Sequence, residues 1–216
     1  MKFLKPGRQT ILIAAVIIVV PVLLAVSITG LKEKYKSLPV YGEAGINTSK
    51  STEHHVQPFT LEDQDGKTFT LADIKNKIVV VDFFFTSCTS VCPKMTMALK
   101  DVADAFRDDD NVALISFTVD PETDDPARLK WYIHHLNISS PHWTFLTGDK
   151  PEIYRLARRS FFLTASDGDG GPNDFIHSDK LVLIDKEKRV RGYYTGTDEK
   201  AVKQLMTDIK KLKYEK

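Results

Sequence analysis

A buried strand that leads directly into two cysteines and an amphipathic helix is the feature that most constrains the fold of this chain. Residues 78–85 (IVVVDFFF) are a nearly continuous β-branched and aromatic run, typical of a central strand covered on both faces. Apolar residues then recur at helical spacing, which predicts an amphipathic helix over residues 93–107. Cys88 and Cys92, the two cysteines of the chain, lie where the strand ends and the helix begins. We therefore expect the loop between them to carry both sulfurs.

The other apolar runs alternate between strand and helix patterns. Short alternating runs around Asp65-Gly66 predict a hairpin, and residues 112–119 predict a second buried strand. Asp125 supplies a cap for a helix over residues 126–136 that starts with proline. The later expected elements are a strand at residues 142–146, a helix containing Ile153 and Leu156, a hairpin around residues 186–188, and a final helix from Asp198. This order predicts an α/β domain of thioredoxin-like architecture with an N-terminal hairpin extension.

A long apolar run precedes the domain. Residues 11–30 (ILIAAVIIVVPVLLAVSITG) have no charged side chain, and about 20 residues at ~1.5 Å each match the roughly 30 Å core of a bilayer. This predicts a single transmembrane helix. A short tail before an exported domain is a signal-anchor arrangement, so we expect residues 1–10 in the cytoplasm and the domain on the periplasmic side of the cytoplasmic membrane. A cleaved signal peptide is the alternative, because Ala25-Val26-Ser27 is a passable cleavage site.

Residues 31–57 carry charges, glycines and a proline but no sustained apolar period, which predicts a stalk. The folded domain is expected over residues 58–216. A total of 216 residues allows one globular domain plus an appendage. The net charge of +1 indicates no electrostatic footprint for a polyanion, so nucleic acid is not an expected partner.

The placement of the cysteines indicates chemistry. Thiols at the start of a helix face the positive end of its macrodipole, which lowers their pKa and makes them better nucleophiles and metal ligands. A structural disulfide is the alternative, although closing so short a loop removes little entropy from the unfolded chain. Cys88 and Cys92 are therefore expected to form a redox pair or a soft-metal site, suited to Cu(I) or, with more ligands, to Zn(II).

A metal would need a third donor, and the chain has six histidines. His177 differs from the others because it follows a Gly- and Asp-rich loop and immediately precedes a strand expected near the cysteine helix. From spacing alone its role stays open, since a lone histidine at a strand start is more often a polar edge residue. The remaining five lie in the stalk, on the helix over residues 126–136 or at a strand start: His54, His55, His134, His135 and His142.

The same loop contains Asp167, Asp169 and Asp174, which superficially suggests calcium. It lacks the spacing and the terminal glutamate of an EF-hand. A solvated acidic loop is the better interpretation.

Three segments in order carry a resemblance to a known family: DFFFTSCTSVCPKM from Asp82, TVDPETDDPARLKWY from Thr118 and HSDKLVLIDKEKRVRGYYTG from His177. Together they resemble the SCO/SenC family of copper proteins involved in cytochrome c oxidase assembly. The resemblance covers residues 58–216, and the N-terminal anchor agrees with it. It implies copper ligation by Cys88, Cys92 and His177.

The chain departs from the family's pattern between the cysteines. Thr89 and Ser90 stand where the family often has proline and an acidic residue. The two cysteines are unchanged by this difference, but the rigidity of the loop, the pKa of the thiols and the redox potential of the pair can differ from those of the family. Asp120, Pro121 and Asp124 match the family's DPxxD, for which we expect a structural role.

The resemblance implies a copper metallochaperone that assists assembly of the dinuclear copper centre of cytochrome c oxidase. Its expected partners are oxidase subunit II and a copper donor protein or thiol reductant. Cu(I) would take two thiolates and an imidazole, whereas Cu(II) would add an oxygen or nitrogen donor.

Two further functions stay open. The first is a thiol-disulfide oxidoreductase that uses Cys88 and Cys92 to reduce the oxidase's copper-binding cysteines, although CxxxC has one residue more than the usual CxxC. The second is a peroxidatic role, suggested by Thr86 two residues before Cys88. It is disfavoured because no arginine near the cysteine is identifiable from the sequence.

Overall fold

A computed structural model describes residues 17–23, 37–42, 45–47, 54–163 and 178–215. The chain divides into two compact units, Met1–Ser37 and Leu38–Lys216. In the first unit, residues 17–23 are helical with exposed side chains. No helix within these described ranges has the length and apolar character that crossing a membrane requires. The transmembrane helix expected over residues 11–30 lies mostly outside them and stays a prediction.

The second unit contains a β-sheet, in which strands far apart in the sequence are neighbours. Its strands are β1 (Val40–Gly42), β2 (Gly45–Asn47), β3 (Thr60–Asp63), β4 (Thr68–Thr70), β5 (Ile78–Phe84), β6 (Val112–Thr118), β7 (Trp143–Thr147), β8 (Lys180–Ile184) and β9 (Val190–Thr195). In the described part of the chain they form one sheet in the order β2-β1-β9-β8-β5-β6-β7-β3-β4. Strands β5, β6 and β7 are parallel neighbours, and β8 lies antiparallel between β5 and β9. The expected hairpins are present as β3–β4 and β8–β9.

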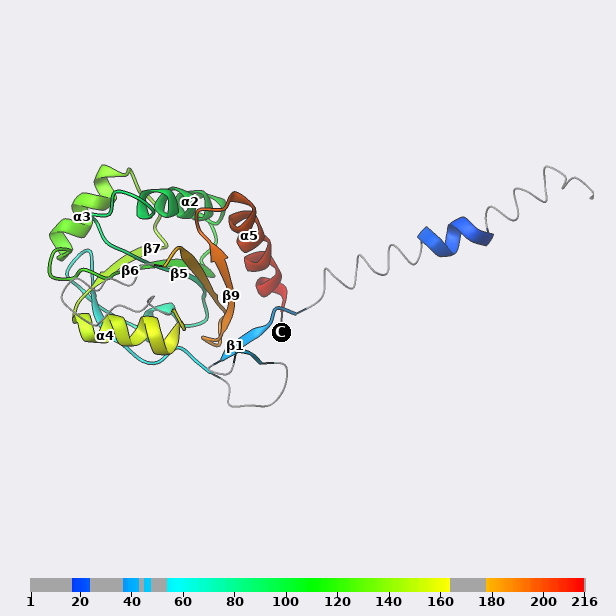
Figure 1. The fold of residues 1–216 in the computed structure, drawn as a ribbon, viewed down its shortest axis with the longest axis horizontal. Coiled ribbons are helices and arrows are strands. Elements are labelled where there is room, and N and C mark those ends of the chain that lie inside the picture. Colours follow the sequence, from blue (N-terminus) through cyan, green and yellow to red (C-terminus); the bar gives the residue numbers. More distant parts are fainter. Residues whose placement is uncertain (1–16, 24–36, 43–44, 48–53, 164–177, 216) are drawn as a thin grey trace, which may run out of the picture. The chain divides into compact units, whose positions relative to one another are not determined.

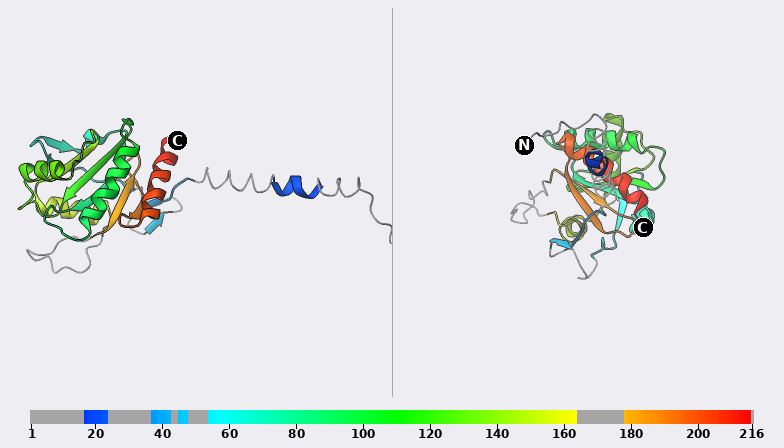
Figure 2. Two further views of the ribbon diagram at one scale, coloured as in Figure 1. Left: turned by 90° about the horizontal axis from the view of Figure 1, so that it is seen from above. Right: turned by 90° about the vertical axis from the view of Figure 1, so that its right-hand side faces the viewer.

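Helices cover both faces of this sheet. They are α2 (Cys92–Ala105), α3 (Pro126–His135), α4 (Lys150–Arg155) and α5 (Glu199–Tyr214), with a 3-10 helix at Leu71–Ile74 and a π-helical turn at Leu156–Ser160. Because parallel strands need a crossover connection, α2 joins β5 to β6 and α3 joins β6 to β7. Helices α2, α3 and α5 lie on one face and α4 on the other (Figure 1). Seen from above, α2 and α5 lie over the strands (Figure 2).

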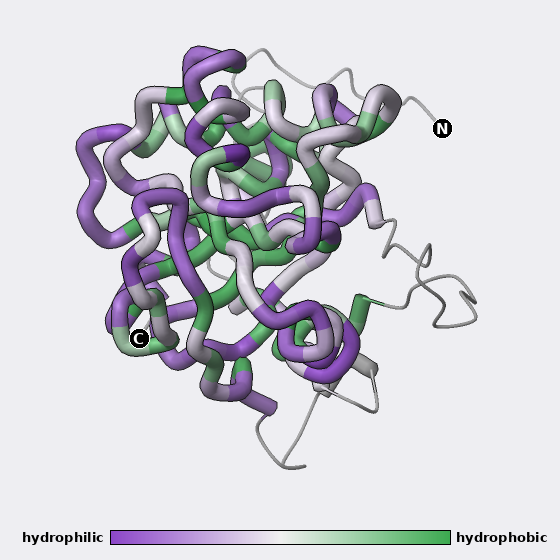
Figure 3. Tube along the Cα trace, turned by 90° about the vertical axis from the view of Figure 1, so that its left-hand side faces the viewer, coloured by the Kyte–Doolittle hydropathy of each residue, from purple (hydrophilic) through white to green (hydrophobic). Residues whose placement is uncertain are grey.

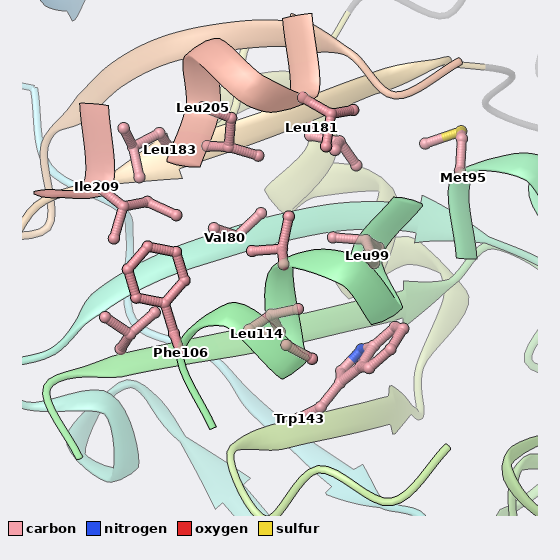
Figure 4. Close-up of a cluster of buried hydrophobic side chains, with 14 of the residues drawn as sticks. Val80, Met95, Leu99, Phe106, Leu114, Trp143, Leu181, Leu183, Leu205 and Ile209 are labelled. Carbon is pink, nitrogen blue, oxygen red and sulfur yellow. The ribbon is translucent and has the colours of Figure 1, made fainter. Parts of the chain in front are cut away.

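Strand β5 is buried along its whole length, as expected for the central strand. Side chains alternate across a strand, so Val80 and Phe84 face the cluster under α2, α3 and α5, while Val81 and Phe83 face the cluster under α4. Figure 4 shows the first cluster, with Val80 between residues of α2, α5 and β8. Apolar residues gather along the strands and polar ones on the outside of the fold (Figure 3). The mixed α/β sheet expected from the sequence is therefore confirmed.

Part of the expected stalk belongs to the sheet. Strands β1 and β2 fall within residues 31–57, and Tyr41 of β1 pairs with Val190 of β9. The preceding backbone is held by buried Arg191, which donates to the carbonyl oxygens of Pro39 (3.0 Å) and Leu38 (2.7 Å). A basic side chain in the interior thus determines where the chain joins the sheet.

Candidate metal and redox site

Both cysteines lie at the junction of β5 and α2. Cys88 is half-buried in the connecting loop, whose turn is closed by a bond from its amide to the carbonyl of Phe85 (3.2 Å). Cys92 is the first residue of α2 and is buried. Its backbone N–H donates to the sulfur of Cys88 at 3.4 Å, and both thiols are free. The Cys88 sulfur thus accepts a bond from an amide that the helix leaves unpaired.

Two influences compete over the charge of Cys88. Burial opposes a charged thiolate, but hydrogen bonds from Cys92 and Ser90 together outweigh it and lower the pKa of Cys88 to about 7. The hydroxyl of Ser90, one of the residues that depart from the family's pattern, lies 3.8 Å from the sulfur. About half of Cys88 is therefore thiolate at neutral pH, which suits both nucleophilic attack and metal ligation.

Cys92 is the opposite case. Burial, reinforced by its contact with Cys88, raises the pKa of the Cys92 thiol to about 12. Cys92 therefore holds its proton while Cys88 reacts. A soft metal bound by both sulfurs would displace that proton.

A buried carboxyl lies on the same side of the sheet. Burial raises the pKa of Asp82 to about 7, although a hydrogen bond from the hydroxyl of Ser116 (2.5 Å) acts to lower it. The Ser116 hydroxyl oxygen in turn accepts a hydrogen bond from the indole N–H of Trp143 (2.9 Å). The charge of Asp82 also contributes to the raised pKa of Cys92. Asp82 was not among the predicted site residues. Its signal was an acidic residue inside the otherwise apolar run IVVVDFFF.

A second buried carboxylate holds the start of the cysteine loop. Asp124 is fully buried and accepts bonds from the amide (3.0 Å) and the hydroxyl (2.5 Å) of Thr86 and from the hydroxyl of Thr118 (2.5 Å). It ties the ends of β5 and β6 to the segment before α3. These bonds give the last residue of DPxxD the structural role expected for it.

The fold brings an arginine to this point, which the sequence did not reveal. Nε of Arg128 donates to the hydroxyl oxygen of Thr86 at 3.0 Å, across 42 residues of sequence. The Thr86 hydroxyl donates its own hydrogen to Asp124. That hydrogen is therefore not directed at the Cys88 sulfur, which counts against the peroxidatic role even though an arginine is present.

His177 lies outside the described residues, as do Asp167, Asp169 and Asp174. Within the described ranges, no group of three or more His, Cys, Asp and Glu side chains could hold a metal ion. Four of the other histidines have contacts elsewhere: His54 with the carbonyl of Ser160, His55 with the carbonyl of Glu187, His142 with Asp110, and His135 with Trp131.

Comparison with known proteins decides the family. A family model described as SCO1/SenC matches residues 47–213, which include every strand from β3 to β9 and both cysteines. The chain belongs to the SCO1/SenC family. The resemblance seen in the sequence is therefore confirmed.

Individual SCO1/SenC relatives agree with this assignment. The SCO1 protein homolog of Bacillus subtilis is 33% identical over 159 residues, which are 73% of this chain and 82% of the relative. The solved structure of BsSco, a Sco-family cytochrome c oxidase assembly protein with a disulfide switch, is 31% identical with a TM-score of 0.65, covering 78% of this chain and 98% of that one. ScoI of Bradyrhizobium japonicum, solved with copper bound, is 30% identical with a TM-score of 0.57, covering 70% and 97%.

Proposed function

We propose that this chain is a copper metallochaperone that carries copper on Cys88, Cys92 and His177 and assists assembly of the dinuclear copper centre of cytochrome c oxidase. The observation that carries the proposal is the half-buried Cys88 sulfur, with its pKa of about 7, held 3.4 Å from the amide of Cys92. The copper-bound ScoI structure and the assembly role of BsSco support it.

The donor chemistry fits Cu(I) as cargo. Two sulfurs on one short loop are soft ligands, and a neutral imidazole would complete a three-coordinate site. Because Cys88 is partly exposed, thiolates of a recipient protein could enter the coordination sphere as the copper leaves. Cu(II) would need one further oxygen or nitrogen donor.

The direction of β8 supports the choice of His177 as third ligand. Strand β8 is antiparallel to β5, with Val79 opposite Ile184 and Val81 opposite Val182. The start of β8 therefore lies toward the end of β5 from which the cysteine loop leaves. His177 precedes the first residue of β8 by three positions in the sequence.

Copper binding by the reduced chain tests the ligand set. Wild-type protein is expected to bind one Cu(I), and Cys88→Ser, Cys92→Ser and His177→Ala are each expected to lose most of that affinity. His142→Ala is the matched control, because its ring contacts Asp110 instead. Wild-type affinity in His177→Ala would show that the ligand set is wrong.

A thiol-disulfide oxidoreductase is the second candidate, favoured by the unequal pKa values of the two thiols. The Cys88 thiolate would attack a disulfide of the oxidase's copper-binding cysteines and release one of them as thiolate. Cys92, after losing its proton, would attack the Cys88 sulfur of the mixed disulfide and release the other. This leaves a Cys88–Cys92 disulfide, which a thiol reductant must reduce. His177→Ala separates the two functions, because exchange needs only the sulfurs.

We also propose that residues 11–30 anchor the chain in the cytoplasmic membrane with residues 58–216 on the periplasmic side. The absence of charged side chains from that run supports the anchor. Fractionation of cells expressing the full chain, followed by protease treatment of spheroplasts, tests it. Release of the domain without the N-terminal segment would instead indicate signal-peptide cleavage.

A further inference from the structure

An aromatic and cationic stripe runs along the outward face of α3. It consists of Arg128, Trp131 and His135, which we call the α3 stripe. Trp131 is 48% exposed, whereas Leu129 and Tyr132 of the same helix are buried in the core. An indole left in water beside a filled core is a candidate contact for another protein, because Trp and Arg are enriched among the residues that dominate binding energy.

The stripe is held in one arrangement before any partner arrives. The guanidinium carbon of Arg128 lies 4.1 Å from the centroid of the Trp131 ring. The ring of His135 stacks on Trp131 at 4.8 Å with an interplanar angle of 11°. Side chains three and four positions apart meet on a helix, so both contacts follow from the spacing. A side chain fixed in this way loses little conformational entropy on binding.

The stripe begins beside the cysteine loop. Arg128 donates to the hydroxyl oxygen of Thr86, which is two residues before Cys88. Helix α3 is also joined to α2 by the hydrogen bond between Tyr132 and Thr96 (3.0 Å), and the two helices lie on the same face of the sheet (Figure 1). A protein that brings its own thiols to Cys88 is therefore adjacent to the stripe.

The charge around α3 is mixed. The helix PARLKWYIHH contains no Asp or Glu, but Asp125 caps it. Lys130 is paired with Asp65 at 3.1 Å, and the Arg128 guanidinium donates to Thr86, whose hydroxyl is bonded to the buried carboxylate of Asp124. The exposed ring of Trp131 and its place beside the cysteine loop, and not net charge, therefore indicate the contact.

We propose that the α3 stripe is the docking surface for the protein that receives copper from Cys88. The inference rests on the proposed metallochaperone function. Trp131 is the central anchor, and Arg128 and His135 hold its ring in place.

Copper transfer from the loaded full chain tests the docking surface. The recipient probe is the purified soluble domain of cytochrome c oxidase subunit II with its cysteines reduced, and the readout is the second-order rate constant. Trp131→Ala and His135→Glu are expected to slow transfer at least tenfold, and Trp131→Phe by less than threefold. Tyr214→Ala is the matched control, because Tyr214 is an 85% exposed aromatic residue at the end of α5.

The outcomes separate the docking surface from the function. Each variant is first shown to bind copper as wild type does, which also shows that it is folded. Absence of transfer from wild type would overturn the metallochaperone function and the docking surface with it. Wild-type transfer that Trp131→Ala and His135→Glu leave unchanged would overturn the docking surface alone. A dimer seen in sedimentation that Trp131→Ala dissociates would also overturn it, because the stripe would then bind a second copy of the chain.

Discussion

The backbone amide of Cys92 points at the sulfur of Cys88, 3.4 Å away, at the first turn of α2. One helix start therefore makes the two thiols chemically different. Cys88 lies outside the helix and receives the hydrogen bond, whereas Cys92 lies inside it and is buried. The same arrangement prepares Cys88 to react first in either copper binding or disulfide exchange.

Alkylation of Cys88 is expected to rise with pH through a midpoint near 7. Thiolate is the reactive form, and hydrogen bonds that outweigh burial lower the pKa of Cys88 to about 7. Cys92 is expected to react far more slowly across this range, because its pKa is raised to about 12. Iodoacetamide labelling followed site by site by mass spectrometry measures both. The denatured chain is the control, in which both thiols should titrate at about 8.5. Equal midpoints in the folded chain would contradict the assignment.

Asp82→Asn is expected to remove part of the pH dependence of stability. The pKa of Asp82 is raised to about 7 in the fold from 3.8, so the folded chain keeps a proton that the unfolded chain releases. Stability is therefore lost as pH rises from about 4 to about 7. One pKa unit is about 1.4 kcal/mol, which makes the loss at most about 4 kcal/mol. Urea unfolding of wild type and variant at pH 4 and pH 8 measures the difference, and parallel pH profiles would refute it.

Asp124→Ala is expected to lower the free energy of unfolding by about 3–5 kcal/mol, because it leaves buried donors of Thr86 and Thr118 without their acceptor. Chemical denaturation provides the value. Glu122→Ala, two residues away and exposed, is the control and should change stability by less than about 0.5 kcal/mol. If Asp124→Ala changed the free energy of unfolding as little as Glu122→Ala does, this network would not hold the cysteine loop.

Arg191→Ala is expected to destabilise the fold by about 1–3 kcal/mol, because the buried carboxylate of Asp185 loses one of its two arginine partners and keeps only Arg189. It also removes the donors that hold Leu38 and Pro39. Limited proteolysis under native conditions should therefore cut near the start of β1 faster than in wild type. Arg107→Ala, which breaks an exposed pair with Asp104, is the control and should change neither measurement. If Arg191→Ala were cut near β1 no faster than wild type, Arg191 would not be what holds Leu38 and Pro39.

Local patterns in the sequence predicted most of the elements. Continuous apolar runs predicted β5 and β6. Asp125 was predicted as a helix cap and Asp198 as the start of the final helix, and both are N-caps in the structure. Strands β1 and β2 were not predicted, because three-residue strands carry too little periodicity and depend on a neighbour such as β9 to form. Cys88 and Cys92 were expected from their placement to form a redox pair or a soft-metal site, and the resemblance implied His177 as the third ligand. Copper ligation by all three stays a prediction.

The amino-acid sequence by itself determined the order of strands and helices, the pairing of two thiols at one helix start and the family to which the chain belongs. These are local properties, readable from the period of apolar residues and the spacing of a few polar ones. Only the tertiary structure decided how charge is distributed around the thiols. Asp82 meets Ser116 across 34 residues and Arg128 meets Thr86 across 42, and such contacts arise from strand register and helix packing, which no short window of sequence contains.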